Sequence, residues 1–375
     1  MRKKIALLLT LALAASSLAA CGGSKPAESA AATTAAAAET TAAAGDTKAA
    51  DTTAAAAEGE DPYAALGDFT MMVGHAQPEG NPRYVSMEKF AADVAEKTNG
   101  HVTVEVFANG QLGTEKEMLE QVVAGTVQGM RGGQFDFSPR LLMFTLPFLT
   151  QNRAQVTALL NSDLAKKVCT EAEAETGTVI ISLCDAGGYR QFSNSKHPIT
   201  KPEDLKGLKM RTNGMNTIDK TFIAMGATTT TIPYSDLYMG LKTSVADGQE
   251  NPWVNVEGMK FYEVQKYFTE VNYQFHPDPF YINAAWWNSL PAEYQEIIQA
   301  CADEMGVYND QLIDETQEAA KQVVVDAGCE VYEPSAEELK VFQDAVQVVY
   351  DQCVEEGILT AEELKEMQDI VASAK

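Results

Sequence analysis

The chain has 375 residues, which is too long for one compact domain and suits two or three. Hydrophobic residues make up 45 % of it, enough for a sizeable core. Acidic residues outnumber basic residues 53 to 28, and the net charge is -25. Because affinity for a phosphate backbone comes from Lys and Arg, this charge excludes a nucleic-acid binder held by a general basic surface. A local cluster of arginines can still bind a small anion.

The first residues are typical of an export signal. Arg2, Lys3 and Lys4 precede an apolar run of about eleven residues, which is too short for a stable membrane span. The run leads to Leu-Ala-Ala-Cys-Gly, which resembles a bacterial lipobox. We therefore predict a signal peptide over residues 1–20 and a diacylglycerol on the thiol of Cys21. The alternative is an ordinary signal peptide in which Cys21 is incidental.

Residues 21–61 are predicted to be the lipidated cysteine and a disordered tether. From residue 24 to residue 61, 24 of 38 residues are alanine or threonine, and no Leu, Ile, Val, Met or aromatic residue occurs. Such a segment has no apolar surface to bury. No later run is apolar enough to cross a bilayer. The sequence thus predicts an exported globular body anchored to the outer face of the cytoplasmic membrane, in a periplasm or at the cell surface.

Five further cysteines lie in the globular body, and none of them forms a C-x-x-C pair. An odd number cannot all form disulfides with one another. We interpret them as small buried hydrophobic residues, and one disulfide that spacing cannot assign stays open. They are Cys169, Cys184, Cys301, Cys329 and Cys353.

Strand and helix patterns alternate in the first part of the body. Short apolar runs predict strands near residues 69–73, 102–106, 179–183 and 208–210. Apolar residues at helical spacing predict helices near residues 87–94, 114–123 and 218–223. Thr114 and Glu117 have the spacing of a capping box, which marks a helix start. This alternation indicates an α/β architecture with largely parallel sheets.

The C-terminal third is more helical. Ser289 and Pro291 mark the start of a helix that runs to about Val325, which is unusually long. Ser335 and Thr360 are each followed three residues later by Glu, which predicts two more helix starts. No Gly- or Ser-rich linker divides the body. Two lobes must therefore be joined by crossing strands or by the long helix.

Several motifs of catalysis and metal binding are absent. The four histidines include no pair at the i, i+4 spacing of a helical metal site. The sequence contains no nucleophile elbow, phosphate-binding loop or dinucleotide fingerprint. We therefore expect no cofactor and no metal, and an enzyme is less expected than a binding protein.

A basic segment stands out in this acidic chain. Residues 188–212 contain six Lys and Arg, opposed only by Glu203 and Asp204. Arg190 follows a Gly-Gly-Tyr turn and Arg211 ends a short apolar strand, where α/β sheets bind ligands. Two guanidinium groups there can hold one carboxylate through their planar forks. We interpret the four lysines as solvated surface charge.

A polar string, Asp-Gly-Gln-Glu-Asn-Pro, follows at residues 247–252. Pro252 favours extended geometry at Asn251, which fixes the direction of the Asn251 amide. An amide beside two arginines can accept from a ligand hydroxyl or donate to a carboxylate. The alternative, a polar turn that holds two segments together, stays open.

Several segments resemble, in order, the extracytoplasmic solute-binding subunit of tripartite ATP-independent periplasmic (TRAP) transporters, of the dicarboxylate-binding DctP type. The string at residues 247–252, after the Arg211 strand, is the most specific of them. The resemblance covers about residue 69 to the C-terminus. The matching segments are 110–120, 190–194, 207–211, 224–227, 232–238, 245–252, 261–267 and 286–291.

The resemblance implies a fold of the α/β class. It is two-lobed and periplasmic-binding-protein-like, with crossover strands and a long helix spanning both lobes. We expect residues 62–188 and 277–318 to form lobe I, and residues 189–276 and 319–375 to form lobe II. The ligand is expected in a cleft that closes around it.

The resemblance also implies roles for four residues. Arg211 matches the family's carboxylate-clamping arginine, and Arg190 matches its second, supporting arginine. Asn251 matches a polar residue that faces the ligand. Tyr234 matches an aromatic position that packs near the clamp.

Other residues are weaker candidates for ligand contacts. Arg131 lies where the sequence departs from the family pattern. We give equal weight to two interpretations of Arg131. It contacts a second acidic group of the ligand, or it lies on the protein surface. The further candidates are Tyr189, Asn213, Glu115 and His75.

The function implied is that of a lipid-anchored binding protein that captures an organic acid and delivers it to the large and small membrane subunits of a TRAP permease. No enzyme activity and no nucleic acid are expected. Two alternatives stay open: an exported enzyme that acts on acidic sugars, and a sensor or adhesion lipoprotein. The sequence does not identify the acid.

Overall fold

The computed structural model describes residues 61–135 and 137–374. The predicted signal peptide, Cys21 and the tether up to residue 60 lie outside the described residues. Asp61, expected as the last tether residue, accepts a hydrogen bond from Asn99 and contacts the His101 ring at 2.6 Å. In the described ranges, no helix combines the length and the apolar character that crossing a membrane requires.

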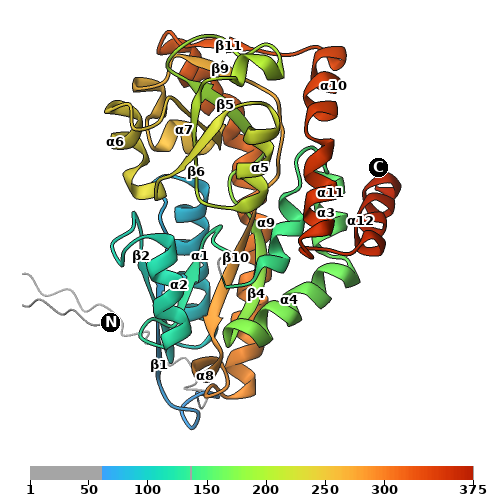
Figure 1. Cartoon of the computed structure of the whole chain (residues 1–375). Helices are drawn as coiled ribbons and strands as arrows, with labels where there is room; N and C mark the ends of the chain where they lie inside the picture. Colours follow the sequence, from blue (N-terminus) through green and yellow to red (C-terminus); the bar gives the residue numbers. More distant parts are fainter. Residues whose placement is uncertain (1–60, 136, 375) are drawn as a thin grey trace, which may run out of the picture. The chain divides into compact units, whose positions relative to one another are not determined.

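The first sheet, sheet A, has five strands in the order β2-β1-β3-β10-β4 (Figure 1). Strands β1, β2 and β3 are parallel, whereas β10 runs antiparallel to both of its neighbours. We call the part of the protein built on this sheet the sheet A lobe. Its strands are β1 (Phe69–Gly74), β2 (Val102–Phe107), β3 (Gly129–Arg131), β4 (Thr178–Asp185) and β10 (Pro277–Asn283).

The second sheet, sheet B, has six strands in the order β11-β9-β5-β8-β6-β7. Here β5 runs antiparallel to both β8 and β9, and the other pairs are parallel. We call the part built on it the sheet B lobe. Its strands are β5 (Arg190–Asn194), β6 (Lys209–Thr212), β7 (Thr228–Thr231), β8 (Gly248–Pro252), β9 (Tyr267–Thr269) and β11 (Glu330–Tyr332).

The antiparallel strands are those that receive the chain from the other lobe. The chain passes from β4 of sheet A to β5 of sheet B, and it returns from β9 of sheet B to β10 of sheet A. Both sheets are therefore mixed, and the expectation of largely parallel sheets is wrong in this respect. The expected crossover strands are present.

The first crossover, the segment between β4 and β5, is held by the carboxylate of Asp185. Asp185 ends β4, and its side chain accepts hydrogen bonds from the backbone N–H groups of Gly187 and Gly188. Both glycines have positive φ, 135° and 93°, a conformation that side chains with a Cβ rarely adopt. A Cβ at Gly187 would also meet Pro252 and Val254 at 2.9 Å. The turn therefore requires glycine where the chain changes lobes.

The helices begin largely where the capping signals place them. The capping boxes predicted at Thr114, Ser335 and Thr360 are all confirmed. The helices are α1 (Pro82–Lys97), α2 (Glu115–Ala124), α3 (Arg153–Leu160), α4 (Asp163–Thr176), α5 (Asn216–Ala224), α6 (Leu237–Lys242), α7 (Trp253–Gly258), α8 (Ala284–Trp287), α9 (Ala292–Asp326), α10 (Ala336–Ala345), α11 (Gln347–Glu355) and α12 (Ala361–Ser373).

Helix α9 has 35 residues and is about 50 Å long at 1.5 Å per residue. It packs against α1 and β4 of the sheet A lobe and against α7 of the sheet B lobe. Its buried residues run from Tyr294 to Val324, so one stripe of the helix is covered along most of its length. The predicted long helix that spans both lobes is therefore confirmed.

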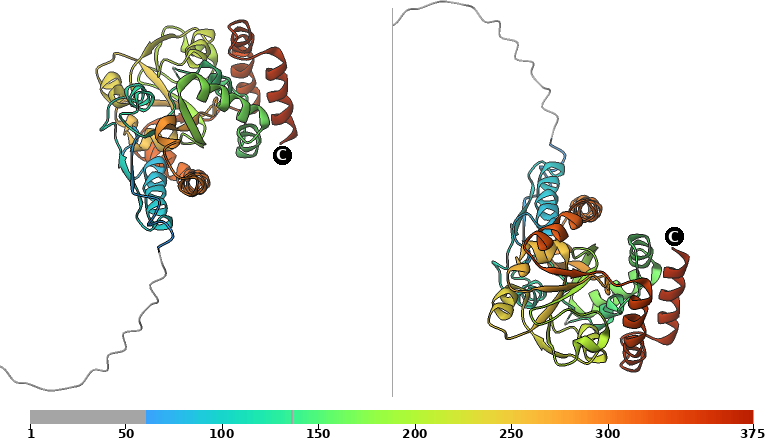
Figure 2. Two further views of the ribbon diagram at one scale, coloured as in Figure 1. Left: turned by 90° about the horizontal axis from the view of Figure 1, so that it is seen from below. Right: turned by 90° about the horizontal axis from the view of Figure 1, so that it is seen from above.

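The last three helices pack as a group on one side (Figure 2). Helix α11 contacts α5, and α12 contacts α3. An ion pair helps to hold this group in place, because Nη2 of Arg140 lies 2.6 Å from a carboxylate oxygen of Glu363 in α12. The C-terminal helices thus contact elements from both of the lobes that the sequence predicted.

All five cysteines of the described residues are free. Cys184, Cys301 and Cys353 are buried, which confirms that they serve as small hydrophobic residues. Cys169 and Cys329 are half-buried. The open alternative of one disulfide is not realised.

Candidate functional site between the two lobes

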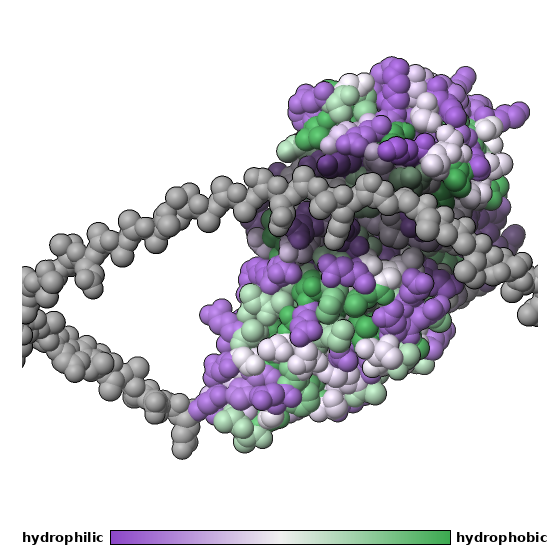
Figure 3. Space-filling view, turned by 90° about the vertical axis from the view of Figure 1, so that its left-hand side faces the viewer, coloured by the Kyte–Doolittle hydropathy of each residue, from purple (hydrophilic) through white to green (hydrophobic). Residues whose placement is uncertain are grey.

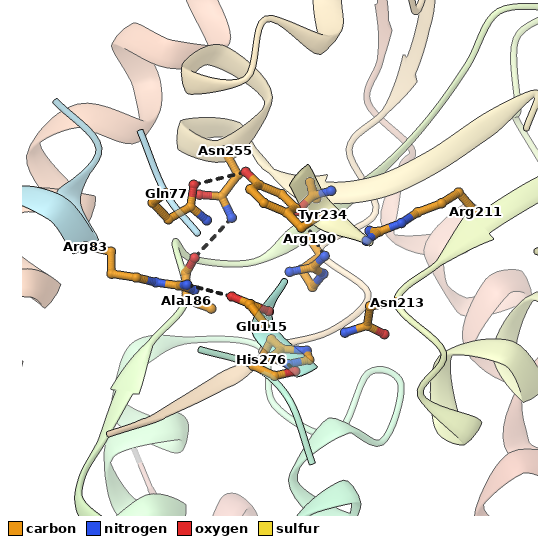
Figure 4. Close-up of a pocket in the computed structure, with 12 residues that line it drawn as sticks. Gln77, Arg83, Glu115, Ala186, Arg190, Arg211, Asn213, Tyr234, Asn255 and His276 are labelled. Atoms are coloured by element: carbon orange, nitrogen blue, oxygen red, sulfur yellow. Dashed lines mark hydrogen bonds and ion pairs between the residues drawn. The ribbon is translucent and has the colours of Figure 1, made fainter. Parts of the chain in front are cut away.

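A polar cavity lies where the two lobes meet (Figure 4). The space inside it, together with the open solvent at its mouth, is about 370 Å³. Both lobes and the first crossover contribute to its lining. We call it the interlobe cavity, and its lining residues are Gln77, Arg83, Glu115, Gly133, Ala186, Arg190, Arg211, Asn213, Tyr234, Asn251, Asn255 and His276.

The surface of the protein shows the same division. Figure 3 shows a recess between the part that carries sheet B, above, and the part that carries sheet A, below, with hydrophilic residues along its borders.

Arg211 is the distinctive charge of this cavity. It is the third residue of β6, and only 1 % of it is exposed. Its Nε donates to the carbonyl of Ile232 at 2.8 Å, and no described carboxylate pairs with it. Burial lowers the pKa of Arg211 to about 10, an effect that Glu250 opposes and Arg190 reinforces. A buried cation without a counter-ion is a strong attractor for an anionic ligand.

Arg190 is held in place by the protein itself. It opens β5, directly opposite β8, and its guanidinium pairs with the Glu250 carboxylate through two nitrogens. Its Nη2 also donates to the side-chain carbonyl of Asn251 at 3.0 Å. Burial alone would lower the pKa of Arg190, but Glu250 outweighs it and raises the pKa. Arg190 is therefore a fixed, neutralised neighbour of Arg211.

Asn251 and Tyr234 also line the cavity. Asn251 is a residue of β8, and its amide donates to Gln249 while its carbonyl accepts from Arg190. The polar string at residues 247–252 is thus largely a buried strand, and the alternative of a polar turn is wrong for it. The Tyr234 hydroxyl donates to the side-chain carbonyl of Gln77 at 3.0 Å. Burial raises the pKa of Tyr234.

Two of the five weaker candidates lie in the cavity. Glu115 opens α2, and its Oε1 accepts from Arg83 at 2.9 Å. Asn213 follows β6, and its carbonyl accepts from the backbone N–H of Met215. The amide nitrogen of Asn213 and the second carboxylate oxygen of Glu115 have no partner among the described residues.

The structure does not bring the other three weaker candidates to the cavity lining. Arg131 is fully buried and pairs with Asp278 at 2.9 Å, so the alternative of a surface arginine is also wrong. The Tyr189 hydroxyl donates to Thr150 at 3.0 Å, away from the cavity. His75 is buried, and its Nδ1 accepts from the backbone of Gln77.

Sequence reasoning missed several lining residues, above all Arg83 and His276. Arg83 follows Pro82 in the first turn of α1, where an arginine normally extends into solvent. It is buried because its Nε lies 2.8 Å from Asp278, a residue almost two hundred positions away. His276 directly precedes β10 and Asp278 lies on it, and only the polar character of the His-Pro-Asp-Pro segment signals them. The missed residues are Gln77, Arg83, Gly133, Ala186, Asn255 and His276.

A second cavity adjoins the first. Glu115, Arg211, Asn213 and Tyr234 line both of them. The space inside it, together with the open solvent at its mouth, is about 820 Å³. Its other lining residues are Thr114, Lys116, Gln134, Gly214, Thr231 and Pro233. In the described residues, no group of three or more His, Cys, Asp or Glu is placed to hold a metal ion.

Comparisons with known proteins agree on one family. The family model "Bacterial extracellular solute-binding protein, family 7", or DctP, matches residues 73–357. The C4-dicarboxylate-binding periplasmic protein DctP of Rhodobacter capsulatus is 31 % identical over 287 residues, which cover 75 % of this chain and 85 % of that protein.

Solved structures extend this likeness. A TRAP periplasmic solute-binding protein from Desulfovibrio salexigens with bound orotic acid has a TM-score of 0.77 and 28 % identity, over 82 % of this chain and 99 % of that one. Another from Sulfitobacter sp. NAS-14.1 with bound β-D-galacturonate has a TM-score of 0.75 and 26 % identity, over 81 % of this chain and all of that one. The chain therefore belongs to the DctP family, the extracytoplasmic solute-binding proteins of TRAP transporters, whose members are transport proteins and not enzymes.

Proposed function

We propose that this protein captures a small organic acid in the interlobe cavity, closes around it, and delivers it to the membrane subunits of a TRAP permease. The observation that carries the proposal is Arg211, a buried guanidinium in the cavity whose two terminal nitrogens have no partner among the described residues. A ligand carboxylate would supply the missing counter-charge through two parallel hydrogen bonds.

The neighbours of Arg211 support a carboxylate clamp. Arg190, neutralised by Glu250, positions the Asn251 amide beside the clamp. Asn213 adds a free amide donor, and Tyr234 also lines the cavity. The relatives' ligands fit this proposal, because C4-dicarboxylates, orotic acid and galacturonate all carry a carboxyl group.

Closure of the lobes would bury the ligand charge and strengthen the clamp. We propose residues 62–188 and 277–318 as lobe I and residues 189–276 and 319–375 as lobe II. The two separate sheets support this division, and so do the crossovers before β5 and β10. The lobes then move about the two crossovers while α9 packs against both.

We also propose that Cys21 carries a lipid and anchors the protein outside the cytoplasmic membrane, close to the large and small permease subunits. The lipobox-like sequence supports this part of the proposal. A tether rich in alanine and threonine would let the folded body reach the permease.

A ligand screen followed by mutation of Arg211 tests the proposal. Thermal shift of a soluble form that starts near residue 61 should identify acids that stabilise it, by about 2.7 kcal/mol at 100 times the dissociation constant. Truncating one partner of a buried charge pair costs about 2–5 kcal/mol, so Arg211→Ala should weaken binding roughly 30- to 5,000-fold. Arg211→Lys should recover only part of this loss because an ammonium lacks the planar fork.

Lys206→Ala is the matched control, because Lys206 belongs to the same basic segment but is exposed and outside the cavity. It should change affinity little in calorimetry. If Arg211→Ala binds the same acid within about threefold of the parent, at the affinity scale of 1.4 kcal/mol per decade, the proposed clamp is wrong.

A further inference from the structure

We infer that the ligand carries one carboxylate and several hydroxyl groups, as a sugar acid does, and not two carboxylates. This inference rests on the proposed function and concerns the half of the site that lies away from Arg211. It follows from a count of the charges that line the interlobe cavity and of the charges directly behind them.

The arginine on the opposite wall is already neutralised. Arg83 lies between two carboxylates, with its Nη1 2.9 Å from Glu115 and its Nε 2.8 Å from Asp278. Burial disfavours its charge, but Asp278 and Glu115 outweigh burial and raise the pKa of Arg83. A second ligand carboxylate would therefore find no unsatisfied positive charge at Arg83.

Behind this wall the charges also balance. Asp278 lies between Arg83 and Arg131, at 2.8 Å and 2.9 Å. Arg131 uses its remaining nitrogens to donate to Ser86, to the Asp185 carbonyl and to Asn309. Two arginines and two carboxylates thus form a closed network with no net charge.

The histidine of the cavity adds no positive charge either. Burial, reinforced by Arg190, lowers the pKa of His276 to about 3, so its ring is neutral at ordinary pH. The ring Nε2 lies 3.2 Å from the Gly133 carbonyl, which can only accept, so Nε2 carries the hydrogen. The Nδ1 atom is then an acceptor without a partner among the described residues, as a ligand hydroxyl requires.

The other free groups of this wall also suit hydroxyls. Glu115 has a second carboxylate oxygen that can accept, and the Gln77 amide nitrogen can donate while its carbonyl accepts from Tyr234. A hydroxyl both donates and accepts, so it can satisfy either group. A second carboxylate beside Glu115 would be repelled, and like charges at close range cost several kcal/mol in comparable interfaces.

The adjoining cavity gives room for a longer chain. Thr114, Gln134 and Thr231 line it with hydroxyl and amide groups. Lys116 is a cation on this lining that does not belong to the interlobe cavity, and it is exposed at the surface. An exposed ammonium contributes little to holding a carboxylate. The pair of cavities therefore suits a polyhydroxylated acid better than a compact four-carbon diacid.

The test compares two pairs of compounds by calorimetry: D-gluconate and D-glucuronate, against succinate and L-malate. The unaltered protein should bind at least one of the two sugar acids about tenfold or more tightly than either diacid. Glu115→Gln removes the negative charge that neutralises Arg83. It should therefore shift the ratio of affinities towards the diacids by about tenfold.

Glu120→Gln is the matched control, because it makes the same charge change on the exposed face of the same helix, outside both cavities. It should leave the ratio unchanged. Diacids that bind as tightly as the sugar acids to the unaltered protein would overturn the inference, as would a ratio that Glu115→Gln does not move. The first comparison needs no variant, so it decides even if Glu115→Gln fails to fold.

The proposed function and this inference fail differently. If the diacids bind at least as tightly as the sugar acids and Arg211→Ala abolishes their binding, the proposed carboxylate clamp is supported and only this inference is wrong. If no organic acid binds, or if binding ignores Arg211, the proposed function itself is wrong.

Discussion

The hydroxyl of Tyr234 in the sheet B lobe donates a 3.0 Å hydrogen bond to Gln77 in the sheet A lobe. A second bond of this kind joins Asn81, at the start of α1, to Asn255 of α7, also at 3.0 Å. Tyr234, Gln77 and Asn255 all line the interlobe cavity. The two lobes are therefore fastened to each other at the place where a ligand would be held.

Tyr234→Phe should weaken ligand binding without unfolding the protein. Loss of one hydrogen bond costs about 0.5–1.5 kcal/mol, so the dissociation constant should rise roughly two- to tenfold. Because the bond joins the two lobes, most of the change should appear in the dissociation rate measured by stopped-flow fluorescence. Tyr238→Phe is the control, since the Tyr238 hydroxyl bonds to Glu263 within the sheet B lobe. Equal dissociation rates for Tyr234→Phe and the parent would contradict this role.

Two buried arginines should respond oppositely when each is replaced by methionine without ligand. The lowered pKa of Arg211 corresponds to a cost of about 3 kcal/mol for keeping its charge in the folded state. Arg211→Met should therefore leave the free energy of unfolding unchanged or raise it, by at most about that amount. Urea unfolding of the ligand-free variant measures this, and a loss above about 2 kcal/mol would show that Arg211 is structural.

Arg190→Met is the matching variant. It leaves the Glu250 carboxylate buried without its partner, which typically costs about 3–5 kcal/mol. The free energy of unfolding should fall by that amount, and binding should be lost with it. If Arg190→Met proves as stable as Arg211→Met, the division between a supporting arginine and a ligand-binding arginine is wrong.

Stability should fall in mild acid because of two buried histidines. Burial lowers the pKa of both His75 and His276 to about 3, whereas an unfolded histidine has its usual value near 6.5. Below pH 6.5 the two histidines take up protons in the unfolded chain, whereas in the folded protein they stay neutral down to about pH 3. The free energy of unfolding should therefore fall by about 1.4 kcal/mol per histidine for each pH unit between 6.5 and 3.

His276→Asn isolates one of these contributions. Between pH 7 and pH 5 the variant should lose about 2 kcal/mol less stability than the parent in urea unfolding, since other titrating groups cancel in the difference. His75→Gln should behave in the same way. Parallel curves of stability against pH for parent and variants would show that neither histidine is held neutral.

Cys21→Ser tests the proposed anchor. Without the thiol the protein should leave the membrane fraction or stay unprocessed, because no diacylglycerol can be attached. Membrane fractionation with mass spectrometry of the N-terminus measures both outcomes. Cys169→Ser, in the folded body, should remain in the membrane fraction. A mature, acylated Cys21→Ser protein would refute the proposal.

Local signals in the sequence predicted local structure well. The helix starts at Thr114, Ser335 and Thr360 depend on hydrogen bonds within four residues, so a short sequence window contains all the information. Strands β1, β2 and β4 were predicted in the same way, whereas the short strand β3 was not. The place of β10 in sheet A was not predicted, because its partners β3 and β4 lie roughly one hundred to one hundred and fifty residues away in the chain.

The site was predicted in part for the same reason. Arg190 and Arg211 stood out as bases in an acidic chain, and both line the cavity. Arg83 gave no comparable signal because its burial depends on Asp278, which lies on a different element. Arg131 was misplaced because the groups that enclose it, Asp278 and Asn309, are far away in the sequence. Charge pairs between segments that are distant in the chain cannot be predicted from a single sequence.

The position of β10 has a consequence for the order in which the protein folds. This strand lies between β3 and β4 in sheet A, yet it follows all but one strand of sheet B in the chain. A nascent chain that ends before residue 277 therefore holds sheet A in two unjoined pieces, although most of sheet B is already present. Such long-range pairing makes folding slow and couples the domains. The interlobe cavity, whose lining comes from both lobes, is thus completed only when β10 has joined sheet A.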